Sequence, residues 1–324
     1  MNAVQFSYPI GFTKNLKDKP IRVLLQGKPL VMFRGKEGKI IVLEDRCPHR
    51  GVPLSKGKVD SDGIVCPYHG WTFSEGGRCV KIPGVSDCKM RGIHSAKSLK
   101  VQEKYGLIWV GEGKIPEIKE WDTHDCFYMV NEAESSVLHV MENALDPLHT
   151  LFIHNGWIRK RGKEKEVKVI VTIEKEGVHA ETVDEEKQQG VIHKLLTMGR
   201  TVVRNFGRVI GPNCFQLEFQ TSKGDSLFMT AFIHPIKEGL VRVYTANLYQ
   251  TTLPKWIFKR LAKTLFEIAV KQDAEMLKIQ SENLKHWKKE KMVSTKGDYM
   301  GPWIEKLLQG EELIPKRYEV VLNV

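Results

Sequence analysis

Two short stretches of the sequence each combine one thiol with one imidazole. The first reads Cys47-Pro-His49-Arg-Gly and the second Cys66-Pro-Tyr-His69-Gly-Trp, with sixteen residues between His49 and Cys66. Thiolates and neutral imidazoles are common protein ligands for zinc and iron. One zinc ion could use all four side chains in a tetrahedron. The usual zinc pattern, however, pairs Cys with Cys and His with His, whereas each loop here carries a mixed pair.

Mixed pairs are typical of a Rieske-type [2Fe–2S] cluster, in which two thiolates bind one iron and two imidazoles bind the other. Replacing thiolates by neutral imidazoles reduces the negative charge on such a cluster and raises its reduction potential. The spacing C-x-H-x16-C-x2-H therefore favours a one-electron carrier over a structural zinc site.

A second group of chemically capable residues lies between Glu142 and His154. It contains Asn143, Asp146, His149 and His154. On a helix, Asp146 and His149 would share a face, and a helix that loosens near its end would direct both imidazoles at one point. Two imidazoles and a carboxylate on one face of a metal suit non-haem Fe(II) oxygen chemistry. The alternative is a pair of core histidines around a helix-breaking Pro147.

A carboxylate that could complete such a site is Asp273. Pro254 opens a helical pattern that runs to about Lys289, and Asp273 lies within its apolar stripe. An unpaired buried carboxylate is costly, so Asp273 requires a cation or a metal ion. A neighbouring lysine or arginine would satisfy it equally well.

Composition limits the class of protein. The 324 residues allow two domains, no apolar run is long enough to span a membrane, and the start resembles no secretory signal. Six cysteines are too few for a disulfide framework, so we expect a reducing cytoplasm. The net charge of +11 comes without a nucleic-acid-binding motif. The charge thus reflects a lysine-rich surface, an acidic docking partner or an anionic substrate.

The elements expected around these residues fall into two groups. Short strand-like runs precede and surround the Cys/His loops, and a polar joint lies near 111–124. Longer strands follow, and the helix from Pro254 comes last. The expected strands of the second part lie at 167–173, 215–219, 227–233 and 240–244.

These stretches resemble the Rieske non-haem iron oxygenases, the ring-hydroxylating oxygenase alpha-subunit family, and especially its homo-oligomeric, phthalate-dioxygenase-like branch. Beside the ligand loops, Gly77-Arg-Cys-Val-Lys-Ile-Pro and Tyr105-Gly-Leu-Ile-Trp-Val match the family form. The resemblance implies an α+β chain. An all-β Rieske domain at 1–115 would precede a helix-grip (START-like) catalytic domain at 116–324, with a curved antiparallel sheet and a long C-terminal helix.

The resemblance also implies roles for individual residues. Cys47, His49, Cys66 and His69 would hold the [2Fe–2S] cluster. His149, His154 and Asp273 would bind mononuclear Fe(II). Asp146 would connect His69 of one subunit to His149 of the next, and Asn143 would sit near the iron. The remaining cysteines would be buried small hydrophobic residues: Cys79, Cys88, Cys126 and Cys214.

An oxygenase component follows from this resemblance. It would use O2 to hydroxylate or oxidatively demethylate a small organic substrate, with monooxygenation favoured over dioxygenation. NAD(P)H would act only indirectly, through a separate flavin and iron–sulfur reductase with or without a ferredoxin. A homotrimer is expected. The alternative is a Rieske electron-transfer protein without oxygenase activity.

Overall fold

The computed structural model describes residues 6–85, 95–175, 177–183, 190–197, 199–287 and 292–324. The chain forms two compact units. One contains residues 2–115 together with 234–238, and the other contains 116–233 together with 239–324.

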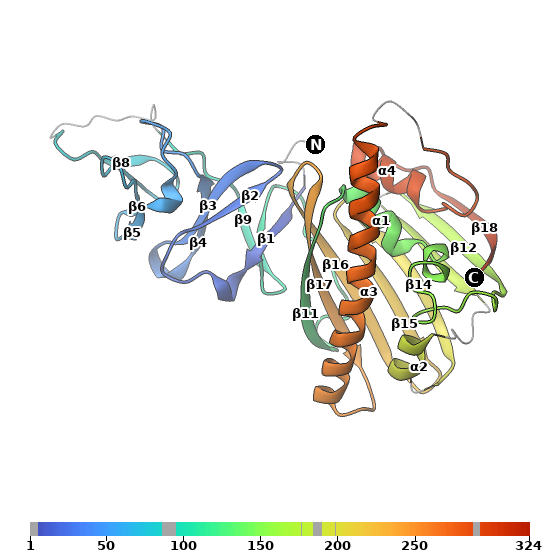
Figure 1. The fold of residues 1–324 in the computed structure, drawn as a ribbon. Coiled ribbons are helices and arrows are strands. Elements are labelled where there is room, and N and C mark those ends of the chain that lie inside the picture. Colours follow the sequence, from blue (N-terminus) through green and yellow to red (C-terminus); the bar gives the residue numbers. More distant parts are fainter. Residues whose placement is uncertain (1–5, 86–94, 176, 184–189, 198, 288–291) are drawn as a thin grey trace. The chain divides into compact units, whose positions relative to one another are not determined.

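The first unit consists of short antiparallel strands in three sheets, ordered β1-β10-β9, β2-β3-β4 and β5-β6-β7-β8 (Figure 1). These strands are β1 (Tyr8–Phe12), β2 (Ile21–Leu25), β3 (Lys28–Arg34), β4 (Ile40–Glu44), β5 (Lys58–Asp60), β6 (Gly63–Val65), β7 (Thr72–Phe73), β8 (Cys79–Lys81), β9 (Val101–Lys104) and β10 (Leu107–Val110). Three 3-10 turns connect them: η1 (Thr13–Asn15), η2 (Lys36–Gly38) and η3 (Leu54–Lys56).

Strand β3 explains how so small a unit obtains two apolar cores. Successive side chains of a strand point to opposite faces, so Leu30 and Met32 enter one core while Val31 and Phe33 enter the other. The second core also contains Cys47 and Cys66. The two Cys/His loops therefore rest on packed apolar side chains.

The second unit is built on an eight-stranded curved sheet, ordered β11-β17-β16-β15-β14-β13-β12-β18. Its strands are β11 (Asp125–Ala133), β12 (Glu166–Glu174), β13 (Gly177–Val183), β14 (Val202–Ile210), β15 (Cys214–Thr221), β16 (Ser226–Lys237), β17 (Leu240–Gln250) and β18 (Lys316–Asn323). The helices are α1 (Val137–Leu145), η4 (Leu148–Leu151), α2 (Val191–Thr197), α3 (Lys255–Leu284) and α4 (Gly301–Gln309). This arrangement confirms the α+β class and the antiparallel sheet with a long helix.

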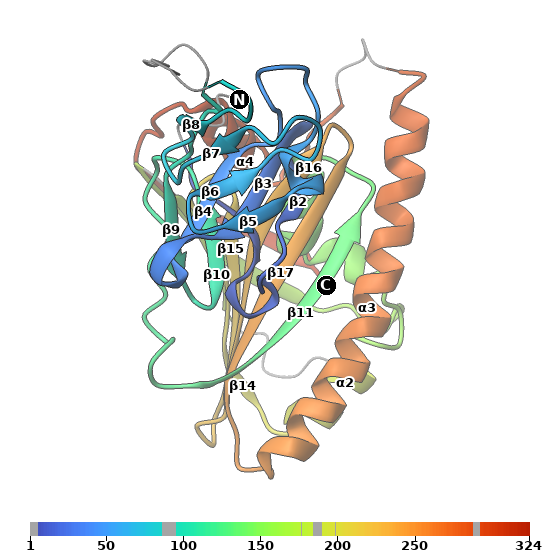
Figure 2. The same cartoon turned by 90° about the vertical axis from the view of Figure 1, so that its left-hand side faces the viewer.

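Helix α3 crosses one face of this sheet (Figures 1 and 2). Pro254 precedes its first turn, where a fixed backbone dihedral and a missing N–H cost nothing. Its buried side chains recur at helical spacing and face the sheet: Phe258, Ala262, Leu265, Phe266, Ala269 and Leu277. The helix ends at Leu284, five residues before the expected Lys289, which lies outside the described residues. None of the described helices is long and apolar enough to cross a membrane.

Candidate functional sites

The two Cys/His loops have the same local construction. The Cys47 carbonyl accepts a hydrogen bond from the Gly51 N–H at 2.8 Å, and the Cys66 carbonyl accepts one from the Gly70 N–H at 3.1 Å. Both glycines have a positive φ, +74° and +69°, which an L-residue adopts only with strain. Each loop therefore turns back on itself within five residues and presents its thiol and its imidazole from the same turn.

The two thiols, of Cys47 and Cys66, are buried, whereas His49 is half-buried and His69 is exposed. The rings of His49 and His69 have centroids 4.7 Å apart. Trp71 stacks on His49 at 4.5 Å. Burial raises the pKa of Cys47 to about 11, although the backbone N–H of His49 opposes that rise. A thiolate at this position therefore needs a strong cation such as iron, and the donor set fits an iron–sulfur cluster.

The geometry of the loops also separates the two metal alternatives. Among the described residues, His149, His154 and Asp273 are the only three potential ligands whose donor atoms all lie within 4.8 Å of one another. In the two loops, the rings of His49 and His69 instead lie against each other, and the Cys47 thiol is hydrogen-bonded with the Cys66 thiol. A pair of imidazoles and a pair of thiols suit two irons better than one tetrahedral zinc ion.

The segment that carries the second group of residues departs from the expected helix. Helix α1 ends at Leu145, and Asp146 adopts an extended conformation with φ −87° and ψ 122°. A residue before proline is disfavoured in the helical region, so Pro147 explains the break. The Asp146 carboxylate then accepts the N–H groups of Leu148 at 2.7 Å and His149 at 3.0 Å. It thereby caps the 3-10 turn η4, which holds His149.

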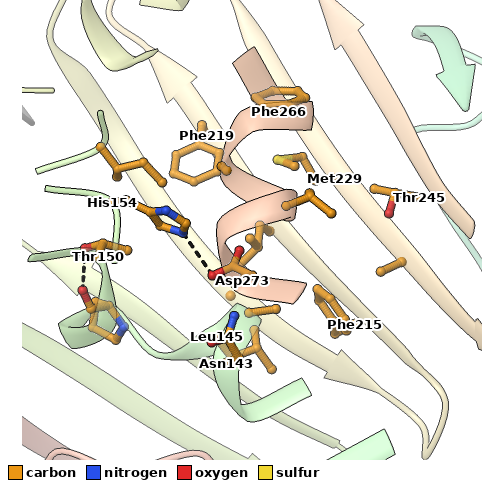
Figure 3. A pocket seen from close by; sticks show the side chains of 18 of the residues that line it. Asn143, Leu145, Thr150, His154, Phe215, Phe219, Met229, Thr245, Phe266 and Asp273 are labelled. Atoms are coloured by element: carbon orange, nitrogen blue, oxygen red, sulfur yellow. Dashed lines mark hydrogen bonds and ion pairs between the residues drawn. The ribbon is translucent and has the colours of Figure 1, made fainter. Parts of the chain in front are cut away.

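Three predicted ligands meet between this segment and α3. His154 Nε2 lies 3.0 Å from Asp273 Oδ1, and His149 Nε2 lies 3.6 Å from the same oxygen. The two imidazole rings are nearly perpendicular, with centroids 5.1 Å apart. Figure 3 shows His154 and Asp273 pointing toward each other, with Asn143 nearby. The structure thus brings together residues from two distant segments; that they bind a metal stays a prediction.

Hydrogen bonding around His154 tests whether these residues fit a metal ion. Its Nδ1 lies 2.9 Å from the side-chain oxygen of Gln272, an acceptor, so Nδ1 carries the proton. In the neutral ring, the Nε2 lone pair then faces Asp273 Oδ1, which is also an acceptor. That oxygen is buried without a hydrogen-bond partner, and His149 Nε2 lies 3.6 Å from it. Acceptors that converge in this way need a cation between them, and two imidazoles with a carboxylate suit Fe(II).

A proton would be the simplest cation. Burial lowers the pKa of His154, but Asp273 and Gln272 raise it by more, so the net shift favours a proton on this imidazole. A metal ion replaces that proton, because a ligating imidazole must be neutral.

Two residues at this site escaped the sequence analysis. The hydrogen bond of Gln272 to His154 joins positions 118 residues apart, so sequence spacing gives no sign of it. Arg159 has a charged side chain of a kind usually found at the surface, yet it is only 5% exposed. It donates to Thr150 Oγ1 at 2.7 Å and to the Pro147 carbonyl at 3.1 Å, which fixes η4.

The expectation for the remaining cysteines was partly wrong. Cys79 and Cys214 are buried, but Cys126 is exposed on the edge strand β11. An edge strand has only one neighbour to cover it, which explains the exposure. Cys88 lies outside the described residues.

A cavity of about 340 Å³ lies beside the three predicted ligands. Asn143 and Asp146 line it together with His149, His154 and Asp273. Met229 lines the cavity, whereas Phe152, close to His149 and His154 in sequence, is 64% exposed. The other lining residues come from both strands and helices, a grouping that the sequence alone does not give.

Comparison with known proteins finds two family models in this chain. The Rieske [2Fe-2S] domain matches residues 6–101, and the vanillate O-demethylase oxygenase C-terminal domain matches residues 133–309. The second match covers more than half of the chain.

Individual relatives agree with these matches. Chloroplastic chlorophyllide a oxygenase of Chlamydomonas reinhardtii is 36% identical over 166 residues, 47% of this chain and 25% of that protein. Chloroplastic protein TIC 55 of Arabidopsis thaliana is 30% identical over 299 residues, 86% of this chain and 53% of that protein. The crystal structure of dicamba monooxygenase bound to dicamba has the same fold, with a TM-score of 0.81 at 16% identity over 95% of this chain and 97% of that one.

The chain spans between a quarter and about half of the length of these curated relatives. Its Rieske domain carries the Cys/His pairs of a [2Fe–2S] cluster, and its C-terminal match includes all three residues that converge beside the cavity. The chain belongs to the Rieske non-haem iron oxygenases.

Proposed function

We propose that this chain is the oxygenase component of a multicomponent Rieske oxygenase. The domain at 1–115 would hold the [2Fe–2S] cluster through Cys47, His49, Cys66 and His69. The domain at 116–324 would hold Fe(II) through His149, His154 and Asp273. The reaction is the hydroxylation or oxidative demethylation of a small organic substrate, as a monooxygenation rather than a dioxygenation.

One observation supports this proposal above the others. Asp273 Oδ1 and the Nε2 atoms of both histidines converge beside a cavity, and the buried carboxylate oxygen has no hydrogen-bond partner. An electron carrier without oxygenase activity has no use for such a group. When bound, the cluster supplies single electrons and the mononuclear iron supplies a place for O2 to react.

The protein's own residues prepare this place. Gln272 holds the proton of His154 on Nδ1 and so leaves Nε2 free to bind metal. Asp146 orders η4 through two backbone N–H groups, and its Oδ2 lies 3.6 Å from His149 Nδ1. Asp146 is partly exposed, so it remains accessible to a second group such as the His69 imidazole of another subunit. The apolar cavity excludes water from the reacting substrate.

The stoichiometry of the reaction indicates that the protein needs an electron-donating partner. A monooxygenation uses O2, two electrons and two protons; one oxygen atom enters the substrate and the other leaves as water. NAD(P)H would provide the electrons through a separate flavin and iron–sulfur reductase, with or without a ferredoxin. The net charge of +11 would favour an acidic reductase. We place the protein in the cytoplasm as a homotrimer that binds no nucleic acid.

The first test is the content of iron and acid-labile sulfide per chain, in protein purified without air. An oxygenase component should contain about three irons and two sulfides. His149→Ala and Asp273→Ala should each lose one iron and keep the absorption spectrum of the cluster. Asp122→Ala, which removes an exposed carboxylate, is the matched control and should lose nothing.

Two other results would contradict the proposal. Two irons and two sulfides, unchanged after addition of ferrous iron, would identify an electron carrier. Zinc without sulfide would refute the cluster as well.

A further inference from the structure

The shape of the cavity indicates the class of molecule it accepts. On α3 its lining extends from Phe258 to Leu277, which lie about 28 Å apart along a helix that rises 1.5 Å per residue. Asp273 is near one end of this span, so about 22 Å of helix separates it from Phe258. The cavity is therefore elongated, with the predicted iron ligands near one end and a long arm leading away from them.

The long arm is mainly apolar, although polar residues such as Thr221, Ser226 and Gln250 also line the cavity. Phe258 and Phe266 come from α3, Phe219 from β15, Leu227 from β16, and Ile192 and Leu196 from α2. Figure 3 shows Phe219, Phe266 and Met229 grouped on one side of Asp273. An apolar molecule gains free energy by leaving water for such a surface, in proportion to the area that it buries.

Charges around the cavity do not suit an anion. Arg159 is the one lysine or arginine among the described lining residues, and its guanidinium already donates to Thr150 and Pro147. The lining carboxylates Glu132 and Asp225 are each paired with an arginine. A carboxylate substrate buried in the long arm would therefore lack a partner, which is costly. The lining thus argues against an anionic substrate, which was one of three explanations considered for the positive net charge.

Size also matters. A cavity of about 150 Å³ is enough for benzene. A molecule with one ring would therefore leave much of this cavity, about 340 Å³, unfilled.

We propose that the cavity binds an uncharged, elongated apolar molecule. Its reacting end lies beside His149, His154 and Asp273, and the remainder runs along α3 toward Phe258. The assignment of a reacting end rests on the proposed function, whereas the charge and the length of the ligand rest on the cavity alone.

The test compares two series of ligands with equal chain lengths, one with an uncharged hydroxyl head group and one with a charged carboxylate. The affinities of 1-hexanol to 1-decanol and of hexanoate to decanoate are measured at pH 8 on the metal-loaded protein, by displacement of the uncharged fluorophore N-phenyl-1-naphthylamine. We expect the affinity of the alcohols to increase about fourfold per added methylene, which corresponds to burial of each CH₂. Each carboxylate should bind at least about tenfold more weakly than the alcohol of equal length.

Two variants locate the binding. Ala269→Trp would obstruct the long arm one turn before Asp273, and Leu227→Trp would obstruct it from β16. Either variant should remove the gain in affinity from the longer alcohols. Thr264→Trp puts the same side chain on the exposed face of α3 and should behave as the wild type. Thermal melting verifies folding, and if one variant fails to fold, the other decides.

Three outcomes would overturn the inference: carboxylates that bind as tightly as alcohols, affinities independent of length, or folded arm variants that bind like the wild type. The assay needs no turnover, so it is separable from the proposed function. Two irons per chain together with the expected affinities would refute only the proposed oxygenase function. Three irons per chain together with affinities that do not depend on chain length would refute only the proposal of an elongated ligand.

Discussion

The two candidate metal regions are constructed on opposite plans. The cluster region uses two loops close in sequence, and each loop is closed by its own backbone hydrogen bond and its own glycine. The mononuclear region joins a 3-10 segment to a helix that comes more than a hundred residues later. His154 and Asp273 therefore come together only when these two distant segments fold against each other.

Because of this difference, the two metals would contribute unequally to the stability of the protein. The cluster would tie together two loops that rest on a small core, so its free energy of binding adds directly to the stability of that unit. The mononuclear iron would enter a site that the sheet and α3 already hold in place. The first region should therefore depend on its metal for stability, and the second should depend on its surroundings for metal affinity.

The largest effect is expected from Cys66→Ser. Loss of one thiolate should remove both cluster irons and both sulfides, and should destabilise the first unit by about 3 kcal/mol or more. His154→Ala should remove one iron with little loss of stability. Thermal unfolding of both variants checks this contrast. Equal destabilisation by the two substitutions would invalidate the distinction between the regions.

Gln272→Leu should weaken iron binding at the mononuclear site by about 10- to 100-fold, because the imidazole loses the bond that fixes its tautomer. Titration of Fe(II) into protein that retains only the cluster measures this change. Gln272→Glu, which keeps an acceptor for the Nδ1 proton, should restore affinity. Gln280→Leu, farther along the same helix, is the control. Unchanged affinity in Gln272→Leu would show that the imidazole is held by packing alone.

Glu142 makes the stability of the folded protein depend on pH. Burial, assisted by Asp298, Glu305 and Asp146, raises the pKa of Glu142 to about 7. The folded protein thus binds a proton that the unfolded chain has lost above about pH 4.5, and stability falls as the pH rises toward 7.

Glu142→Gln should remove this fall. The variant should match the wild type near pH 4.5 and exceed it at pH 8 by on the order of 2 kcal/mol in free energy of unfolding. Urea denaturation at several pH values measures the difference. A constant difference across pH would indicate a packing effect instead of a titration.

The smallest effects concern the loop glycines. Gly70→Ala should cost about 1–2 kcal/mol because of its positive φ, and its Cβ would also lie 2.9 Å from Pro83 Cγ. Gly51→Ala carries the same φ penalty, but its nearest neighbour is 3.9 Å away, so it should cost less. Chemical denaturation with the cluster present compares them. A larger loss in Gly51→Ala would mean that the two loops are not equivalent.

The contrast between the regions also explains what the sequence could predict. The Cys/His loops were recognisable because all their ligands lie in short segments with fixed spacing. Asp273 was identified because a carboxylate within an apolar stripe needs a cation. Both inferences use information that lies within one helix or one turn.

Other features of the site depend on contacts between distant segments. The end of α1 was predictable in principle from Pro147, yet the 3-10 turn after it was not expected. The bond between His154 and Gln272 and the burial of Arg159 arise only when η4 meets α3 and the sheet. The cavity is defined by strands and helices together, so its lining cannot be read from any one segment of the sequence.

The length of α3 along the cavity has a practical consequence. The side chains of α3 that face the cavity lie at increasing distances from Asp273 along the helix axis. Ala269 is about 6 Å away, Phe266 about 10 Å and Phe258 about 22 Å. Enlarging or trimming one of these side chains would set the greatest length of ligand that the cavity admits. Selectivity for length can thus be adjusted in steps along a single helix, without touching the residues proposed to bind iron.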